Sequence, residues 1–590
     1  MRPHHSTPLV AICFLLTALL LLPACETEEA EIAGALQLRI PDSDDLLGGA
    51  AGDVVRLPIT SPREARIVIL DGIWTQGGAR SVEVAQVLDS EVFVKETTDG
   101  DPHWITRATV RNAAGEVIWA QRVNSLFQLL EFLQVVLDGQ GDVSFTSEQV
   151  YQLVVSQYPE LIQFAVRVPI ALPGGQTYHL ELREPDGTWI ELGSFSIDSL
   201  LAQAQPPTIE AEVTDLARTG PDDDRLTIAI LGDGYTASER LRFEADAQAV
   251  MEHIITTSPL REHSDLMNIK AVWTPSEESG AGYDCNHSGA PAGCEQGFRD
   301  TVYETVFVIP AIMDQFNMPL GDVSDRVAMP LQLSRMFEAG ALANYDEILL
   351  ISNSAKRSGF AGLYVALVTS FDARIHFPHV AVHELGHTLG LLGDEYNVPG
   401  DSCYYNEPTI PLPANIAQIE DGDVKWSDWF DDSTPVPTPP QNASDHPVGA
   451  YLGAYNCDDL VRPAHRCKMN SSLDDFCAVC SEQLVRRLYS FVDPLPLDEN
   501  VVALRVASDI AEIHPTMRSR FERYEIHWTL NGEPLPVTGQ PLRLEAADLV
   551  DFPRDQWLTL EAVVRNASGF LRTSDAEMES VFHFEIMLEE

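Results

Sequence analysis

The chain has 590 residues, of which 45% are hydrophobic and 8% aromatic, so it is long and apolar enough for several packed domains. Its 38 basic and 89 acidic residues give a formal charge of −51, which repels nucleic acid and anionic lipid headgroups at long range. We therefore expect no nucleic-acid partner, and we interpret the acidic excess as a solvated surface.

The first 25 residues have the pattern of a lipoprotein-type signal peptide. Arg2 precedes the apolar run LVAICFLLTALLLL, which is too short to span a membrane. The following LPAC resembles a bacterial lipoprotein box, which implies lipidation of Cys25. We expect export from a bacterial cell and a lipid anchor at the outer membrane, in the periplasm or at the cell surface. The alternative is an ordinary signal peptide with a chance cysteine.

Two β-rich regions are predicted at either end of the exported chain. Residues 26–56 are acidic and without periodicity, which predicts a tether. Residues 57–205 predict an N-terminal β-sandwich with one helix near 125–136, and a structural or spacer role. Residues 496–590 alternate again around an Asn531-Gly532 hairpin, which predicts a C-terminal immunoglobulin-like β-sandwich. In the first region apolar side chains alternate along two runs: Phe164, Val166 and Val168, then Tyr178, Leu180 and Leu182.

Residues 206–224 combine Pro, Gly and acidic residues, which predicts a linker. The run from Asp222 to Asp224 lacks the spacing of a calcium loop, so we favour a solvated linker over a structural Ca2+ site.

Residues 225–495 predict an α/β domain. Thr236 and Glu239 form a capping box ahead of a helix whose apolar stripe ends before Pro259. Three apolar runs predict strands, at 226–231, 268–273 and 345–354. Four further runs predict helices, at 298–316, 321–340, 378–391 and 474–492.

One of these helices holds a candidate zinc site in the sequence HVAVHELGHTLGLLGDEY. His383 and His387 are four residues apart, so both imidazoles project from the same helix face and can bind one metal ion. Glu384 follows the first histidine, where its carboxylate can act as general base on a zinc-activated water. His379, one turn earlier, is expected to be a partly exposed first-turn residue.

A catalytic zinc ion needs a third protein ligand and an open position. Gly390 and Gly393 can take the conformations that turn the chain back beneath the metal directly after His387. The residues that follow this turn are Asp394 and Glu395, and both are candidate ligands.

The exported cysteines include pairs that favour disulfides, although their odd number leaves at least one unpaired. Cys285 and Cys294 lie in one glycine-rich loop and predict a local disulfide. Cys477 and Cys480 form a C-x-x-C without a thioredoxin-like strand before it, so we favour structural disulfides with Cys467 or Cys457 over redox chemistry. The alternative is a second zinc site formed by His465, Cys467, Cys477 and Cys480.

Three motifs, LGDGYTASE, HELGHTLGLLGDEY and CKMN…FCAVC, together resemble the bacterial IgA metallopeptidase family over roughly residues 225 to 490. The resemblance implies a metzincin-like zinc-peptidase domain, with Met469 in the methionine turn beneath the metal. It favours Asp394 as the third ligand. The chain departs from the usual metzincin spacing, because Gly393 stands where a third histidine is expected, and this leaves Glu395 as an alternative.

These observations predict an exported endopeptidase with one catalytic Zn2+ and a protein or peptide substrate. The donor that stabilises the transition state has four candidates: Tyr396, Tyr404, Tyr405 and His465. By analogy with metallopeptidases, the β-rich run at 359–370 is expected to supply an edge strand that pairs with an extended substrate. The competing hypothesis is a non-catalytic adhesion or binding lipoprotein with a structural zinc domain.

Overall fold

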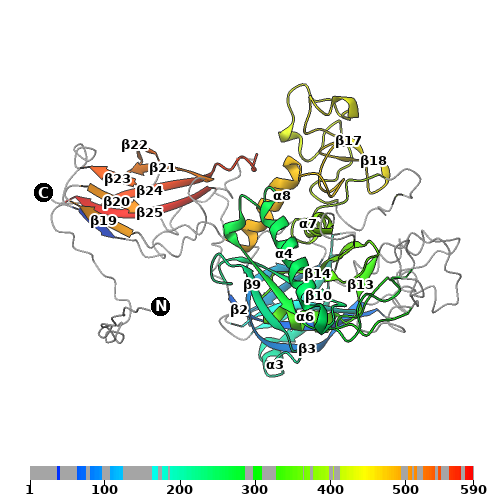
Figure 1. Cartoon of the computed structure of the whole chain (residues 1–590). Helices are drawn as coiled ribbons and strands as arrows, with labels where there is room; N and C mark the ends of the chain where they lie inside the picture. The colour runs from blue at the N-terminus through cyan, green and yellow to red at the C-terminus, as the bar shows by residue number, and fades with distance from the viewer. Residues whose placement is uncertain are drawn as a thin grey trace, which may run out of the picture.

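The fold is multidomain and mostly β-sheet (Figure 1). The signal segment with Cys25 and the predicted helix near 125–136 lie outside the described residues. No helix in the described part of the chain is both long and apolar enough to cross a membrane. The computed structural model describes residues 36–39, 63–74, 80–95, 106–123, 162–170, 176–183, 187–285, 297–307, 327–362, 365–371, 377–397, 403, 412–492, 503–507, 510–514, 523–538, 542–545, 557–572 and 579–588.

The N-terminal region contains two antiparallel sheets that share one apolar cluster. The alternating residues from Phe164 to Val168 and from Tyr178 to Leu182 are buried, as their pattern predicts. One sheet has the order β3-β2-β6, with β2 Arg63–Trp74, β3 Arg80–Val94 and β6 Gln163–Pro169. The other has the order β5-β4-β7-β8, with β4 Thr106–Arg111, β5 Val117–Arg122, β7 Thr177–Arg183 and β8 Trp189–Ser196, and is followed by helix α3 Ile197–Leu201.

A six-stranded mixed sheet forms the centre of the middle domain. Its order is β15-β16-β14-β10-β11-β9. The four inner strands are parallel, and the two outer strands run antiparallel to their neighbours. The bounds are β9 Glu212–Ala217, β10 Leu226–Asp233, β11 Met267–Trp273, β14 Glu347–Ser352, β15 Gly359–Gly362 and β16 Val365–Thr369. The three strands predicted within this domain are therefore confirmed.

Helices cover this sheet on both faces, and alternate residues of β10 reach different cores. Ile228 and Ile230 belong to the cluster that includes helices α4 and α7, whereas Ala229 and Leu231 belong to the cluster shared with α6 and the N-terminal sheets. Helix α7 packs on β15 and β16 and also contacts α4. The helices are α4 Arg240–Thr256, α6 Leu333–Leu342, α7 Phe377–Thr388 and α8 Ala478–Phe491.

The LGDGYTASE motif proves to be structural. The capping box of Thr236 and Glu239 is present ahead of α4, as predicted. Asp233 is buried at the end of β10, where its carboxylate accepts hydrogen bonds from the backbone N–H groups of Tyr303 and Thr305, both at 2.9 Å. These bonds hold the bent 301–305 segment at the end of β10.

The predicted helix at 298–316 is wrong over its described residues, 298–307. The predicted helix at 321–340 is wrong over 327–332 and overlaps α6 from Leu333 on, and residues 308–326 lie outside the described part of the chain. Thr305–Phe307 is a strand, β12, paired with β13 at Ala328–Pro330, and α6 begins only at Leu333. The apolar spacing of this region suits a helix, but the carboxylate of Asp233 takes the backbone N–H groups that a helix would need.

Two segments predicted to lack regular structure contain strands. In the predicted linker, Glu212–Ala217 forms β9, which completes the six-stranded sheet. Asp222 is not freely solvated, because its carboxylate pairs with the Lys270 ammonium at 2.6 Å. In the predicted tether, Leu36–Arg39 forms β1, which pairs with the last strand of the chain.

The C-terminal region contains two antiparallel sheets that Figure 1 shows to one side of the α/β elements. Asn531 and Gly532 have φ values of +49° and +80°, which confirms the predicted hairpin between β21 and β22. One sheet is β1-β25-β24-β21-β22 and the other β19-β20-β23, with β19 Ala503–Ala507, β20 Ile510–His514, β21 Tyr524–Leu530, β22 Glu533–Thr538, β23 Leu542–Glu545, β24 Trp557–Asn566 and β25 Glu579–Leu588.

Between α7 and α8, the residues that the structure describes contain one two-stranded sheet and two short 3-10 turns. These are β17 Tyr451–Ala454, β18 Cys457–Arg462 and the 3-10 turns Ser427–Trp429 and Pro440–Asn442. Helix α8 then connects to the C-terminal sheets, where the Tyr489 hydroxyl lies 3.2 Å from that of Tyr524 and accepts a hydrogen bond from Asn566 at 2.8 Å.

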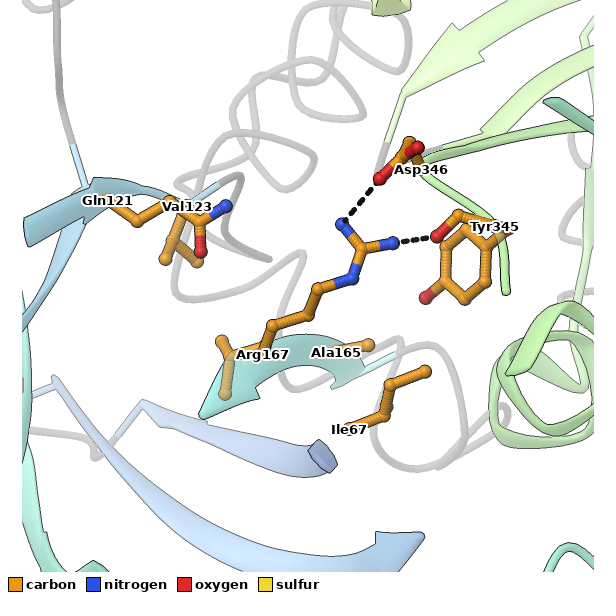
Figure 2. A pocket seen from close by; sticks show the side chains of 8 residues that line it. Ile67, Gln121, Val123, Ala165, Arg167, Tyr345 and Asp346 are labelled. Carbon is orange, nitrogen blue, oxygen red and sulfur yellow. Dashed lines mark hydrogen bonds and ion pairs between the residues drawn. The ribbon is translucent and has the colours of Figure 1, made fainter. Parts of the chain in front are cut away.

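A buried cluster of charges joins the N-terminal sheets to the α/β domain. The Asp346 carboxylate pairs with the Lys95 ammonium, and the two side chains are only 2% and 3% exposed. Arg167 approaches the same carboxylate to 3.8 Å and lines a small cavity beside Tyr345 (Figure 2). Burial lowers the pKa of the Lys95 ammonium, and the charge of Asp346 opposes that shift. The interface therefore depends on Asp346 to balance two buried cations.

Replacing Asp346 by alanine leaves the Lys95 ammonium buried without its carboxylate. Loss of one partner of a buried pair costs about 3 to 5 kcal/mol, and we expect the free energy of unfolding in urea to fall by this amount. The matched control is Asp215→Ala, because Asp215 pairs with Arg218 on the surface, where such pairs contribute about 0 to 1 kcal/mol. Equal losses for the two variants would contradict the prediction.

Candidate metal centre

Helix α7 supplies three polar side chains to one place. The ligand atoms of His383, Glu384 and His387 lie within 4.8 Å of one another, although most of the helix is buried. The helix ends at Thr388, three residues before the predicted end, and Leu391 takes a φ of +55° as the chain turns. This turn brings the following residues back beneath the two imidazoles.

Three acceptor atoms meet at the end of this turn. Asp394 Oδ1 lies 3.2 Å from Nε2 of both His383 and His387, and the two Nε2 atoms are 3.3 Å apart. Ligand atoms about 2.0 to 2.1 Å from a tetrahedral zinc ion are expected about 3.3 to 3.4 Å from one another. The three side chains therefore already have the spacing of a zinc ligand set.

The hydrogen bonds of the imidazoles identify which nitrogen faces this centre. His383 Nδ1 lies 2.8 Å from the Lys468 carbonyl oxygen, and His387 Nδ1 lies 2.7 Å from that of Leu392. A carbonyl only accepts, so each Nδ1 carries a proton, and Nε2 is the nitrogen that faces the centre and can bind a metal ion once the ring is neutral. Asp394 Oδ1 is buried and accepts no hydrogen bond from the described residues. A cation at the centre satisfies all three atoms, and the residues present fit a zinc ion.

The charge of the site shifts the pKa values of its members. Burial alone would lower the pKa of His387, but the Asp394 carboxylate outweighs it and raises that pKa to about 9. Burial alone would raise the pKa of Asp394, but the imidazoles of His387 and His383 hold it well below its usual range. Burial raises the pKa of the Glu384 carboxyl, and the two imidazoles oppose that shift. The centre thus favours an ionised Asp394 beside positive charge.

An asparagine that sequence reasoning missed fixes the turn. Asn415 is fully buried, and its side-chain amide exchanges two hydrogen bonds with the backbone of Gly393, at 2.8 and 2.9 Å. The Tyr455 N–H also donates to the Asp394 carbonyl at 3.2 Å. Asn415 lies in a long irregular segment without periodicity, so no local pattern pointed to it.

Met469 lies directly beneath the ligand helix. It is fully buried, and a Cβ atom added at Gly386 would stand only 2.8 Å from its sulfur. Its carbonyl accepts a hydrogen bond from the Glu395 N–H at 2.9 Å, and the preceding residue, Lys468, provides the carbonyl that orients His383. The Met469 turn therefore supports both the ligand helix and the segment that carries Asp394.

Glu395, the other candidate for third ligand, lies in a different cluster. Its Oε1 atom lies 3.1 Å from Cys480 Sγ and accepts a hydrogen bond from Asn415 at 2.9 Å. The Glu395 side chain is fully buried, whereas those of His383, His387 and Asp394 are 11%, 18% and 16% exposed. Burial raises the pKa of the Glu395 carboxyl well above its usual range. The partly open centre thus contains Asp394, and the closed cluster contains Glu395.

The cysteines differ from the predicted pairing. Cys457 forms a disulfide with Cys403, so it is not the partner of the C-x-x-C motif. Cys467, Cys477 and Cys480 are free thiols. The predicted disulfides of the motif are therefore wrong, because sequence spacing alone cannot show that a carboxylate lies among these three sulfur atoms. Cys285 is disulfide-bonded, and its predicted partner Cys294 lies outside the described residues.

The remaining polar residues considered for the zinc site lie in different surroundings. His379 is partly exposed, and its ring lies 4.0 Å from that of His253 on α4. His465 is exposed and lies against the Tyr451 ring, with the two ring centres 6.0 Å apart. Tyr396 is partly buried, and the remaining candidates, Tyr404 and Tyr405, lie outside the described residues.

Glu384 lies against the edge of the six-stranded sheet. A Cβ atom added at Gly359 would stand 2.3 Å from Glu384 Oε1, so only glycine leaves room for the carboxylate at this point of β15. The β-rich run predicted as one edge strand is a pair, β15 and β16, of which β15 is outermost in the described sheet. A glycine within a strand often marks such a close approach, and this signal was present in the sequence.

Comparisons with known proteins agree with the motifs. A search of curated protein sequences finds no match. Among solved structures, the crystal structure of wild-type OgpA from Akkermansia muciniphila is 10% identical, covers 62% of this chain and 95% of that chain, and has a TM-score of 0.20, which supports no conclusion here. The family described as IgA Peptidase M64 matches residues 214–446, which include the first two of the three motifs. The predicted resemblance is therefore confirmed over residues 214–446, which are similar to the IgA peptidase M64 family.

Proposed function

We propose that the protein is a zinc-dependent endopeptidase whose metal is held by His383, His387 and Asp394. The observation that carries this proposal is the convergence of three acceptor atoms within 3.3 Å of one another in a partly open site. Peptidase activity is the class to which the matched family belongs, and it implies a protein or peptide substrate. Immunoglobulin A as the substrate does not follow from the family name.

Zinc in this site would supply a Lewis acid that polarises a peptide carbonyl and makes water acidic enough to attack it near neutral pH. Glu384 accepts a proton from the attacking water and then donates it to the nitrogen of the leaving amine. Its carboxylate lies within 4.8 Å of the ligand atoms of both histidines, and its raised pKa suits a group that must both take and return a proton. The Lys468 and Leu392 carbonyls keep the two imidazoles in the metal-binding tautomer.

We also propose a metzincin-like arrangement for this domain, flanked by two β-sandwich domains. The position of Met469 beneath Gly386 supports the first part. The paired antiparallel sheets that precede and follow the α/β domain in the chain support the second.

The substrate is proposed to bind as an extended strand along β15. This strand is outermost in the described sheet and passes beside the Glu384 carboxylate at Gly359. An extended peptide can pair with the backbone of such an edge, which positions successive side chains on alternate faces. The scissile bond would then lie between the strand edge and the metal ligands.

We expect Glu384→Gln to abolish most peptidase activity while zinc binding persists, because glutamine cannot accept the proton. General-base catalysis contributes about 100- to 10,000-fold, so kcat should fall within this range against a protein or peptide-library substrate. Glu420→Gln, an exposed glutamate in the same domain, is the control and should retain wild-type turnover. Unchanged activity of Glu384→Gln with zinc bound would reject the proposed mechanism.

We expect Gly359→Val to lower kcat by about 100-fold, the cost of displacing a catalytic group by about 1 Å. The added side chain would collide with both Glu384 and Val380, at 2.3 and 2.6 Å from its Cβ. Zinc content should stay at the wild-type value, since the three atoms nearest to the added Cβ belong to Glu384 and Val380 and not to a metal ligand. Wild-type turnover of a folded, zinc-loaded Gly359→Val variant would contradict the close approach.

We further propose export and lipid anchoring through Cys25, on the basis of the N-terminal signal pattern. In a bacterial host fed a palmitate analogue, the full-length protein should incorporate the label and sediment with membranes. The Cys25→Ala variant should lose the label completely and leave the membrane fraction. Equal labelling of both proteins would refute the lipidation site.

A further inference from the structure

A second cluster of metal-binding side chains lies behind the first. The ligand atoms of Glu395, Cys467, Cys477 and Cys480 all lie within 4.8 Å of one another. Glu395, Cys467 and Cys480 are fully buried, and the three cysteines are thiols. The cluster is therefore separate from the partly open centre, although Glu395 directly follows Asp394 in the chain.

The distances within this cluster fit a thiolate-bound metal better than a disulfide. The sulfur atoms of Cys467 and Cys480 are 3.6 Å apart. Sulfur atoms about 2.3 Å from a tetrahedral zinc ion are expected about 3.8 Å from one another, whereas a disulfide bond measures about 2.05 Å. Cys480 Sγ also lies 3.1 Å from Glu395 Oε1.

One oxygen atom of the cluster has no hydrogen-bond donor among the described residues. Glu395 Oε2 is buried and makes no hydrogen bond among the described residues, while Oε1 is held by Asn415. An unsatisfied carboxylate oxygen beside three buried sulfur atoms is costly unless a cation is present. This orphaned oxygen is independent of the sulfur geometry and points to the same ligand.

The positive end of a helix dipole and one cation lie beside the sulfur atoms. Cys477 is the N-cap of α8, a helix of 14 residues, and Cys480 lies in its first turn, so the positive end of the helix dipole faces both sulfur atoms. The backbone N–H of Cys477 donates to Cys467 Sγ at 3.4 Å. The Arg462 guanidinium is close enough to interact with the charges of Glu395 and Cys467. These contacts offset the negative charge of three thiolates and one carboxylate.

We propose that Glu395, Cys467, Cys477 and Cys480 bind a second, structural zinc ion. Four protein ligands close the site, which is typical of structural rather than catalytic zinc. Binding releases the three thiol protons to solvent and leaves the sulfur oxidation state unchanged. The combination of three thiolates with one carboxylate suits zinc among the metals that soft ligands select. In place of the exposed His465, the carboxylate of Glu395 is the fourth ligand.

This ion would tie together the segments that support the catalytic centre. Glu395 follows the ligand Asp394, and its N–H is bonded to Met469. Cys467 precedes Lys468, whose carbonyl orients His383. Helix α8 contributes the other two ligands. The second zinc ion would therefore hold the turn after α7, the Met469 turn and the start of α8 in one rigid unit.

Metal stoichiometry tests this inference without relying on peptidase activity. The full-length protein, produced with zinc and purified without chelators, should contain two zinc ions per chain when its metal content is measured by inductively coupled plasma mass spectrometry. His387→Ala should contain one, because it loses only the partly open site. Cys480→Ser should also contain one, and the control Glu420→Gln should contain two. A wild-type protein with one zinc ion that His387→Ala loses would overturn the proposal, as would iron or copper in its place.

Cobalt substitution and thiol labelling identify the remaining site. Cobalt(II) bound to the His387→Ala variant should give the intense near-ultraviolet charge-transfer absorption of metal-bound thiolate. Because this variant retains all three cysteines, the measurement still tests the proposal if Cys480→Ser does not fold. After chelation under denaturing, non-reducing conditions, Cys467, Cys477 and Cys480 should all react with an alkylating reagent. A disulfide between any two of them in the purified protein would refute the site. Two zinc ions in a protein whose Glu384→Gln variant keeps full activity would reject only the proposed function.

Discussion

The orientation of two imidazoles is the constraint on which the rest of the site depends. Helix α7 places His383 and His387 on one face, but the helix alone does not decide which nitrogen points toward the metal position. That choice comes from the carbonyls of Lys468 and Leu392, which belong to separate loops. The Met469 turn and the turn after α7 must therefore both be formed before the helix can present two lone pairs to one ion.

Electrostatics act locally in this protein despite its large net charge. The formal charge of the chain is −51, and among the described residues several buried charges occur in compact groups. Lys95, Asp346 and Arg167 form one such group at the junction of two domains. The metal centre forms another. In each group a buried carboxylate lies next to a positive charge or to atoms that can bind a cation. The ionised form of that carboxylate is therefore stabilised by its immediate partners and not by the overall charge of the chain.

The sequence was most informative where local rules and tertiary contacts agree. The strands at 226–231, 268–273 and 345–354, the capping box of Thr236 and the Asn531-Gly532 hairpin were all predictable from short patterns. Of the helix predicted at 298–316, the described residues 298–307 form no helix, because the distant carboxylate of Asp233 binds the backbone N–H groups of Tyr303 and Thr305. The role of Asn415 and the convergence of Glu395 with three cysteines could not be predicted either. Both arise where irregular segments far apart in sequence meet, and no periodicity encodes such meetings.

The adjacency of Asp394 and Glu395 has a consequence for how this region can change. In an extended segment consecutive side chains project in opposite directions, and here one carboxylate enters a partly open centre while the next enters a closed cluster. The pKa values of the two carboxyls are accordingly shifted in opposite directions. A deletion or insertion of one residue between His387 and Asp394 would rotate both carboxylates away from their partners together. The length of this turn is thus restrained twice, because it must place Asp394 in the partly open centre and Glu395 in the closed cluster at the same time.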